Sequence, residues 1–425
     1  MKTTNIRIFR SIFFASLVLA TYISQAQMYP FKSAERVVSL QVWDSTKLLI
    51  KTIDENNLIG LYTIPPNDIP CFMLTTQGQT SAKFAWLNGI KQIKDFKVLN
   101  NHLFFCGQAN NGLGFIACCE VDTLFNPSIS SMEIQIFPSV SEINKIDVYE
   151  KVPKEYHIVA IGNNKCFIHT SSNSCEYCMY VSPCYLSDIV TTDNYIVVLG
   201  KISPSNLALF THPKVNIQNY FGMSYAHNQA RFENFLIERL FGDNLLVSYT
   251  DRPNGYQAQF VRIDARTLQP IAQQSLSDKG KPNPKEMVFN PADSTVLYLS
   301  HAVENKDMIA TIKPYLNYSY PSDVVIPNMC KWGHETLNSL TAYHDNYLSA
   351  IGVDTTTSHL YWFDYKRGTT NLCNCFKVFK EKVIMANTFI PSTRQNYQGI
   401  QVLQKQPQTI QVQHFTPQYN VICND

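Results

Sequence analysis

Short, densely apolar runs recur along this chain at intervals of roughly 50 residues, and each follows a polar turn. A regular interval of this size indicates a repeat architecture, and it limits the possible folds more than any local pattern does. The runs begin at Leu48, Leu103, Tyr156, Tyr195, Leu245, Val296, Tyr347 and, least clearly, Tyr397. The repeat therefore predicts the shape of the protein while leaving its chemistry open.

Most units contain three further apolar segments, as at 95–98, 103–107, 114–117 and 133–137. Four short β-type segments separated by Asn, Asp, Gly and Pro turns predict a four-stranded meander. Some segments, such as 196–199, are apolar at every position, which indicates a sheet covered on both faces. A four-stranded sheet with two buried faces, repeated about eight times, is typical of a propeller blade. We therefore predict an all-β propeller.

The turns agree with this fold class. Asn100-Asn101, Asp193-Asn194 and Gly242-Asp243-Asn244 precede second segments, and these residue types tolerate the left-handed backbone of tight hairpins. The turn at 264–268 follows a third segment and resembles the Asp-x-x-Thr/Gly turns of many bacterial propeller repeats. This resemblance implies an exported bacterial β-propeller repeat protein. The subfamily stays unassigned, because the chain lacks the signature motifs of WD40, kelch and sialidase repeats.

The number of blades is seven or eight. Counting units favours eight, with a closing unit formed by segments 383–389, 398–403, 409–415 and 419–423. Alternatively, a strand near 37–42 completes the last blade, which leaves seven.

Residues 1–26 have the features of a secretory signal peptide. Lys2, Arg7 and Arg10 form a basic region, an apolar stretch follows at 12–23, and Ser24-Gln25-Ala26 is a small-x-small cleavage site. The apolar stretch is too short to cross about 30 Å of hydrocarbon as a helix. We expect cleavage after Ala26, a periplasmic or secreted protein that does not span a membrane, and one propeller domain over residues 27–425.

Loss of the signal changes the formal net charge from +2 to −1. A chain so near neutrality, without a basic run, offers no electrostatic basis for binding nucleic acid. We expect a protein or glycan partner at the cell envelope instead.

All 12 cysteines lie beyond the signal, and an exported protein meets an oxidising compartment that preserves disulfides. The cluster at 166–184 predicts at least one disulfide and no metal, because it holds only one Cys-x2-Cys pair. Free thiols and a tetrahedral zinc site are the alternatives. The candidates for disulfides are Cys166, Cys175, Cys178, Cys184, Cys330, Cys373 and Cys375.

No local motif for catalysis, a cofactor or a metal is present, so we expect no cofactor. Two stretches interrupt the repeat and supply the candidate ligand-binding residues. We expect 216–234 to form a long irregular connection, and 331–335 lies between two units. The candidates are Tyr220, Tyr225, His227, Arg231, Trp332 and Glu335. The alternative is that these aromatic side chains pack on the rim or between blades, as loop residues commonly do.

We therefore expect a binding or scaffold module at the cell envelope. The alternative is a glycan hydrolase or lyase whose carboxylates gather at the mouth of the central channel, so the sequence leaves catalysis undecided. Two carboxylates roughly 5 to 9 Å apart in a solvated cleft would favour glycoside hydrolysis.

Overall fold

The computed structural model of this 425-residue chain is all-β in the part that it describes. It describes the backbone of residues 36–44, 47–53, 59–64, 71–86, 90–120, 133–137, 140–171, 175–179, 184–203, 206–217, 219–226, 232–251, 257–276, 283–303, 306–327, 335–343, 347–354, 360–366, 376–385, 391–395, 404–405 and 410–421. Side chains are described for most of 91–324 and a few later positions.

Successive strands pair antiparallel, so that the chain forms groups of four strands in simple meander order. The first three groups are β1 (Arg36–Asp44), β2 (Lys47–Ile53), β3 (Ile59–Ile64) and β4 (Cys71–Trp86); β5 (Ile90–Leu99), β6 (His102–Ala109), β7 (Gly114–Glu120) and β8 (Glu133–Phe137); and β9 (Ile143–Val152), β10 (Glu155–Gly162), β11 (Cys166–Ser171) and β12 (Cys175–Met179).

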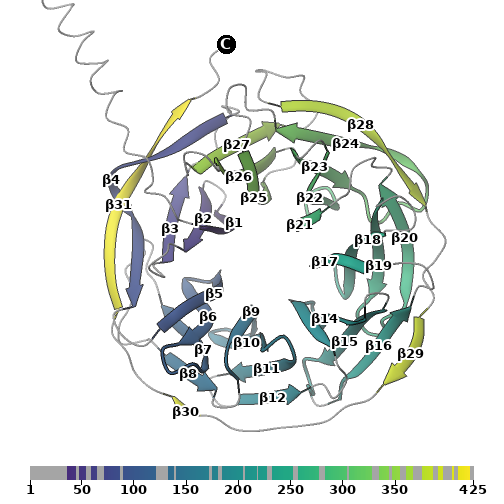
Figure 1. The fold of residues 1–425 in the computed structure, drawn as a ribbon, viewed down its shortest axis with the longest axis horizontal. Coiled ribbons are helices and arrows are strands. Elements are labelled where there is room, and N and C mark those ends of the chain that lie inside the picture. The colour runs from purple at the N-terminus through teal and green to yellow at the C-terminus, as the bar shows by residue number, and fades with distance from the viewer. Residues whose placement is uncertain are drawn as a thin grey trace, which may run out of the picture.

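The next groups continue the pattern. They are β13 (Tyr185–Thr191), β14 (Tyr195–Ser203), β15 (Asn206–Pro213) and β16 (Phe221–Ala226); β17 (Phe232–Arg239), β18 (Asn244–Asp251), β19 (Gln257–Asp264) and β20 (Pro270–Leu276); β21 (Asn283–Asn290), β22 (Thr295–Val303), β23 (Lys306–Ile312) and β24 (Tyr320–Pro327); and a group of three, β25 (Glu335–Tyr343), β26 (Tyr347–Asp354) and β27 (Leu360–Lys366). The groups stand around a common axis, with the first strand of each nearest the axis (Figure 1). This arrangement is propeller-like.

Strand β4 links the first and last groups. Its early residues 71–73 pair with β27, and its later residues 82–84 pair with β3. One long strand therefore serves both groups and joins their seven strands in a single sheet, to which β31, described below, adds an eighth.

The chain then returns around the rim as a C-terminal belt, which we define as β28 (Phe376–Met385), β29 (Pro391–Gln395), β30 (Gln404–Lys405) and β31 (Ile410–Val421). β28 pairs with β24 and β20, β29 with β16, β30 with β8, and β31 with β4. The belt is yellow-green to yellow in Figure 1 and lies outside the groups. The sequence predicted that the last segments of the chain form a closing unit of their own. That prediction is wrong, because these strands pair with the outer edges of earlier groups and not with one another.

The core lies between neighbouring groups, as the apolar runs predict. Residues 196–199 of β14 are fully buried and alternate between two clusters. Val197 and Leu199 pack with β18 on one side, whereas Ile196 and Val198 pack with β10 and β11 on the other. Residues 245–247 are equally buried. The expectation of strands covered on both faces is confirmed.

The turn chemistry is also confirmed at several hairpins. Asn100, Asn101 and Gly242 have φ values of 46°, 61° and 61°, within the left-handed region. In the turn at 264–268, the Asp264 carboxylate accepts the backbone N–H of Thr267 at 2.8 Å. This side chain closes the turn that the sequence motif predicts.

The expected irregular connection at 216–234 is wrong. Backbone hydrogen bonds from Asn216 to Pro213 and from Asn219 to Asn216 mark tight turns, and β16 then pairs with β15 over six residues to complete its group of four. Met223 and Tyr225 occupy alternate positions, and both side chains enter the apolar cluster against β18 and β19. The aromatic residues that suggested a surface loop therefore belong to a strand or to the core, where Tyr220 and Tyr225 are buried.

Candidate functional site

The structure buries the two predicted site tyrosines that it describes. Tyr220 packs against the ring of His212, with centroids 4.6 Å apart. Tyr225 is buried beneath β19, and its hydroxyl donates to the carbonyl of Leu268. Both side chains are core residues in this fold, so neither presents a surface for stacking a ligand.

The other predicted site residues are not brought together. His227, Arg231 and Trp332 lie outside the described residues. Glu335 begins β25, where its backbone pairs with Asp354, and its side chain lies outside the described part. Their proposed role in binding stays a prediction.

Acidic residues on the inner strands form a feature that the sequence analysis missed. Four carboxylates each accept a backbone N–H from the inner strand of the next group along the chain. The bonds run from Ile146 N to Asp95 Oδ2 at 3.1 Å, Thr191 N to Asp147 Oδ2 at 2.8 Å, Phe289 N to Glu238 Oε1 at 3.2 Å, and Leu340 N to Glu286 Oε2 at 2.8 Å. We call these bonds the carboxylate latches, because each joins two neighbouring sheets.

Charges along the axis influence one another. Burial raises the pKa of Glu238 to about 8, and its hydrogen bond from Phe289 lowers it only in part. Burial lowers the pKa of Lys97, but the surrounding carboxylates, led by Asp147 and Asp95, together outweigh this effect and raise it above the ordinary value. Within the described part of the chain, each of the four latch carboxylates is therefore engaged by a backbone amide, unlike the free acid pair that glycoside hydrolysis requires.

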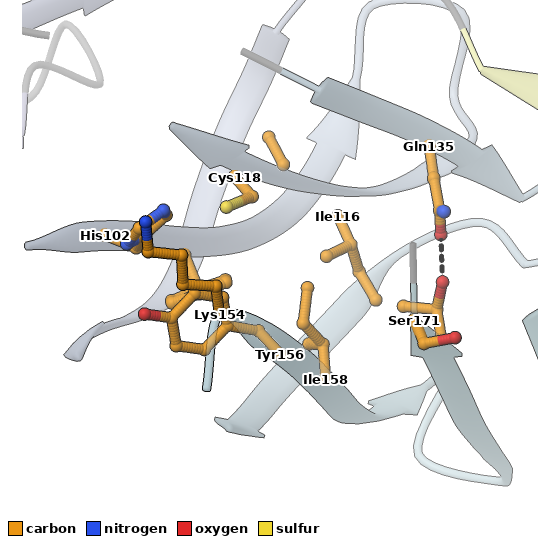
Figure 2. Close-up of a pocket in the computed structure, with 11 residues that line it drawn as sticks. His102, Ile116, Cys118, Gln135, Lys154, Tyr156, Ile158 and Ser171 are labelled. Carbon is orange, nitrogen blue, oxygen red and sulfur yellow. Dashed lines mark hydrogen bonds between the residues drawn. The ribbon is translucent and has the colours of Figure 1, made fainter. Parts of the chain in front are cut away.

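A separate pocket of about 190 Å³ opens between the second and third groups (Figure 2). Its floor is apolar and buried: Phe104 comes from β6, Ile116 and Ala117 from β7, and Ile158 from β10. The volume is below the roughly 300–1,000 Å³ of sites for drug-sized ligands. The pocket therefore suits one small group, such as a single side chain.

Three aromatic rings form one wall of the pocket. The ring of Tyr156 lies 4.6 Å from that of His102 and 5.4 Å from that of Phe104, the second pair in an edge-to-face arrangement. The Asn100-Asn101 hairpin places His102 at the mouth, and its Nδ1 donates to the carbonyl of Asn100 at 2.9 Å. A wall of this kind favours an apolar or aromatic group that meets ring edges and faces.

Hydrogen bonds from neighbouring loops fix the mouth. The carboxylate of Glu150 accepts the side-chain amide of Asn100 at 2.9 Å and the backbone N–H of Lys154 at 2.6 Å. This bridge connects the loop of the second group to that of the third. The hydroxyl of Tyr156 is protonated at neutral pH, as tyrosine ordinarily is, and burial followed by the charge of Glu150 raises its pKa further.

The opposite end of the pocket is polar. The hydroxyl of Thr170 donates to Gln135 Oε1 at 2.5 Å, which links β11 to β8 across the gap. Ser171 lies beside this pair (Figure 2). Sequence reasoning missed the pocket, because its lining comes from five strands of two groups and no local motif marks it.

A buried polar network lies on the other side of the third group. Glu155 Oε1 accepts from His157 Nε2 at 2.8 Å, and His157 Nδ1 in turn lies 2.8 Å from His169 Nε2. The carboxylate of Glu155 accepts from His157 Nε2, and one of the two facing nitrogens, His157 Nδ1 or His169 Nε2, donates to the other. Burial, followed by the neighbouring His157, lowers the pKa of His169 to about 3.

Cysteines are distributed on both faces of the third group. Cys166 packs in the cluster shared with the second group, whereas Cys184 packs in the cluster shared with the fourth. Cys106 and Cys184 are buried free thiols. A disulfide between Cys166 and Cys184 is therefore not formed, because the sheet separates them.

The remaining cysteine predictions are untested. β12 carries Cys175 and Cys178, whose side chains lie outside the described residues, as do Cys330, Cys373 and Cys375. A disulfide among them stays a prediction. Within the described part of the chain, no three His, Cys, Asp or Glu side chains are placed to hold a metal ion. That part also has no helix long and apolar enough to cross a membrane.

No protein family and no curated protein matches this sequence. Similar solved structures include BBS1N in complex with ARL6DN, at 11% identity over 68% of this chain and 96% of that chain, with a TM-score of 0.40. The WD40 domain of SCAP from fission yeast matches at 8% identity over 84% and 97% of the two chains, with a TM-score of 0.38.

The uncharacterized protein lmo1340 from Listeria monocytogenes EGD-e matches at 9% identity over 81% of this chain and 98% of that chain, with a TM-score of 0.39. Likenesses this distant assign neither a family nor a site to the chain.

Proposed function

We propose that this chain is an exported binding module and that the pocket between its second and third groups receives an apolar or aromatic side chain of a protein partner. The observation that carries the proposal is the composition of the pocket, with a buried apolar floor beside the rings of His102, Phe104 and Tyr156. A small, desolvated pocket of this kind is typical of the point where an interface anchors one partner residue.

A protein partner fits the pocket better than a glycan does. A sugar needs several polar groups free to bond its hydroxyls, whereas His102 Nδ1 and Gln135 Oε1 already bond within the protein. Lys154 at the mouth is exposed and can meet a carboxylate or a main-chain carbonyl beside the anchoring side chain. The hydrolase alternative gains no support, because the described inner-strand carboxylates of the latches are bonded to backbone amides.

The same proposal covers organisation and location. Residues 1–26 direct export to the periplasm or beyond, and residues 27–425 form a single propeller domain. We infer seven blades, because the belt strands add to existing edges and β4 serves both the first and the last group. The envelope location rests on the signal-like sequence alone.

A peptide and glycan array probed with the mature protein tests the function. We expect binding to peptides that contain Phe, Tyr, Trp or Leu, and we expect Tyr156→Ala to weaken that binding by about 10- to 100-fold, since a truncated anchor contact typically costs about 1 to 3 kcal/mol. Tyr185→Ala is the matched control, because Tyr185 is 61% exposed and lies away from the pocket. Binding to glycans alone, or equal loss in both variants, would overturn the proposal.

A further inference from the structure

The pocket is a slot between two sheets, and on the second group its lining changes in character from one end to the other. Phe104 of β6 pairs with Cys118 of β7. Ile116 stands two residues before Cys118, on the same face of β7, and pairs with Gln135 of β8. Neighbouring strands are about 4.8 Å apart, so Phe104 and Gln135 are separated by about 10 Å across the sheet. The lining therefore passes from aromatic through aliphatic to polar.

The facing sheet of the third group repeats this order. Tyr156 and Ile158 occupy alternate positions of β10, and Ile158 pairs with Thr170 of β11. An edge-to-face contact between Tyr156 and Phe104 joins the sheets at the aromatic end, and the hydrogen bond from Thr170 to Gln135 joins them at the polar end. Figure 2 shows the two ends on opposite sides of the isoleucines. An occupant must match both ends at once.

Gln135 gives the polar end its capacity to bind a hydroxyl. The end is nearly closed to solvent, since Thr170 is 1% exposed and Ser171 is 8% exposed. Gln135 Oε1 accepts from Thr170 and has a second lone pair, while the side-chain N–H groups of Gln135 bond to nothing within the part of the chain that the structure describes. A sugar would need several such groups, whereas a single hydroxyl needs only this amide. An apolar group would leave the amide unpaired.

We propose that the side chain received by the pocket is a tyrosine, and that Gln135 selects it over phenylalanine by bonding its hydroxyl. This inference rests on the proposed function and adds the identity of the anchoring residue. Tyrosine has an apolar ring and a polar tip, in the order that the lining requires. Its hydroxyl both donates and accepts, as the amide of Gln135 does, whereas the indole of tryptophan only donates and leucine has no polar tip.

Two soluble probes that differ by this hydroxyl test the inference: N-acetyl-tyrosine amide and N-acetyl-phenylalanine amide. NMR titration of the δ1 methyl groups of Ile116 and Ile158 reports binding in the pocket itself. We expect the wild type to bind the tyrosine probe at least about fivefold more tightly, because the phenylalanine probe leaves Gln135 unpaired. Gln135→Met keeps a side chain of similar length without the amide, and it should bring the two affinities within about twofold of each other.

Gln108→Met is the matched control, because Gln108 lies on β6 of the same group and outside the pocket lining. It should keep the preference of the wild type. A preference that survives Gln135→Met would overturn the inference. Equal affinity of the wild-type pocket for the two probes would also overturn it, while leaving the proposed apolar anchor standing. Binding of neither probe at these methyl groups would contradict the proposed function as well.

A third probe makes the test independent of the variant. N-acetyl-O-methyltyrosine amide cannot donate a hydrogen bond, and it places a methyl group against Gln135 and Thr170. We expect the wild type to bind it at least about tenfold more weakly than the tyrosine probe. Equally tight binding of these two probes would overturn the inference even if Gln135→Met does not fold.

Discussion

His212 connects ionisation to folding more directly than any other single group that we describe. Its ring is fully buried between the rings of Phe167 and Tyr220, with centroids 4.1 and 4.6 Å away. Nδ1 lies 3.0 Å from the carbonyl of Ile217, which can only accept, so Nδ1 carries the proton. Burial lowers the pKa of His212 from 6.5 to about 4, while the hydrogen bond to Ile217 raises it only in part.

The sign of the pH effect follows from this direction. The folded pKa lies below the unfolded value, so the unfolded chain takes up a proton first as the pH falls. The contribution of His212 to stability is therefore complete above pH 6.5 and is lost progressively between pH 6.5 and pH 4. At pH 5 the loss is about 2 kcal/mol, at about 1.4 kcal/mol per pH unit over the interval of about 1.5 units.

The test replaces the ring with one that cannot titrate. His212→Phe keeps a flat side chain in the stack but removes the bond to Ile217, so we expect it to cost about 1 kcal/mol at pH 7.5. Between pH 7.5 and pH 5, urea unfolding should show the wild type losing about 2 kcal/mol more than the variant. The quantity to compare is the difference between the two proteins in their change of unfolding free energy. Glu238, whose pKa is raised to about 8, stabilises both proteins as the pH falls, and its effect cancels in that difference.

Phe210→Leu is the matched control, because it disturbs the same cluster and keeps every histidine. Its stability should follow the pH dependence of the wild type at a lower level. Parallel loss of stability in the wild type and His212→Phe would refute the reasoning. A titration of His212 by NMR with a midpoint near its ordinary value would also refute it, because burial would then not suppress its charge.

Two further substitutions test how the sheets are joined. Glu286→Ala removes the acceptor of one carboxylate latch, and we expect urea unfolding to show that the free energy of unfolding falls by about 1 to 3 kcal/mol. Glu142→Ala is the control: it removes a partly exposed ion pair and should cost at most about 1 kcal/mol. Gly107→Ala would place a Cβ 1.9 Å from a backbone oxygen of β5, so we expect a loss above about 3 kcal/mol. Gly112→Ala, with open space around it and φ of +80°, should cost only about 1 to 2 kcal/mol by the same assay.

The sequence predicts the local parts of this fold well because their causes are local. Residues 196–199 are apolar at every position, and only a strand covered on both faces satisfies that pattern. Asn100 and Asn101 adopt left-handed backbone because their side chains tolerate it. Neither inference requires knowledge of which strand comes next in space.

The stretch around Tyr225 shows where such reasoning fails. Amides and aromatic residues close together are typical of a binding loop, and they interrupt the apolar pattern of the neighbouring units. In the structure, alternate residues of β16 enter the core, and the hydroxyl of Tyr225 finds a buried carbonyl 43 residues away. The hydrogen bond to this carbonyl offsets the cost of burying the tyrosine hydroxyl. The sequence around Tyr225 does not reveal that Leu268 will supply it.

The pocket and the belt were missed for a related reason. His102 and Tyr156 stand in equivalent parts of successive units, and only the packing of one unit on the next makes them neighbours. The sequence predicts strands at 383–389, 398–403, 409–415 and 419–423, which coincide only in part with β28 and β31, and it does not predict their partners. The choice of partner depends on which edges the rest of the fold leaves open.

Glu238 shows how a perturbed carboxylate is to be interpreted in this fold. Its pKa near 8 matches that of a general acid in a glycosidase, and such shifts often mark active sites. A catalytic acid, however, must direct its proton at a substrate, whereas Glu238 Oε1 accepts a backbone N–H from the next sheet. The same bond is formed by Asp95, Asp147 and Glu286 at other pairs of neighbouring sheets. A glycosidase active site, by contrast, needs a single pair of carboxylates that face one substrate. Repetition of the bond from sheet to sheet indicates a structural role, and the raised pKa follows from the burial that joining the sheets requires.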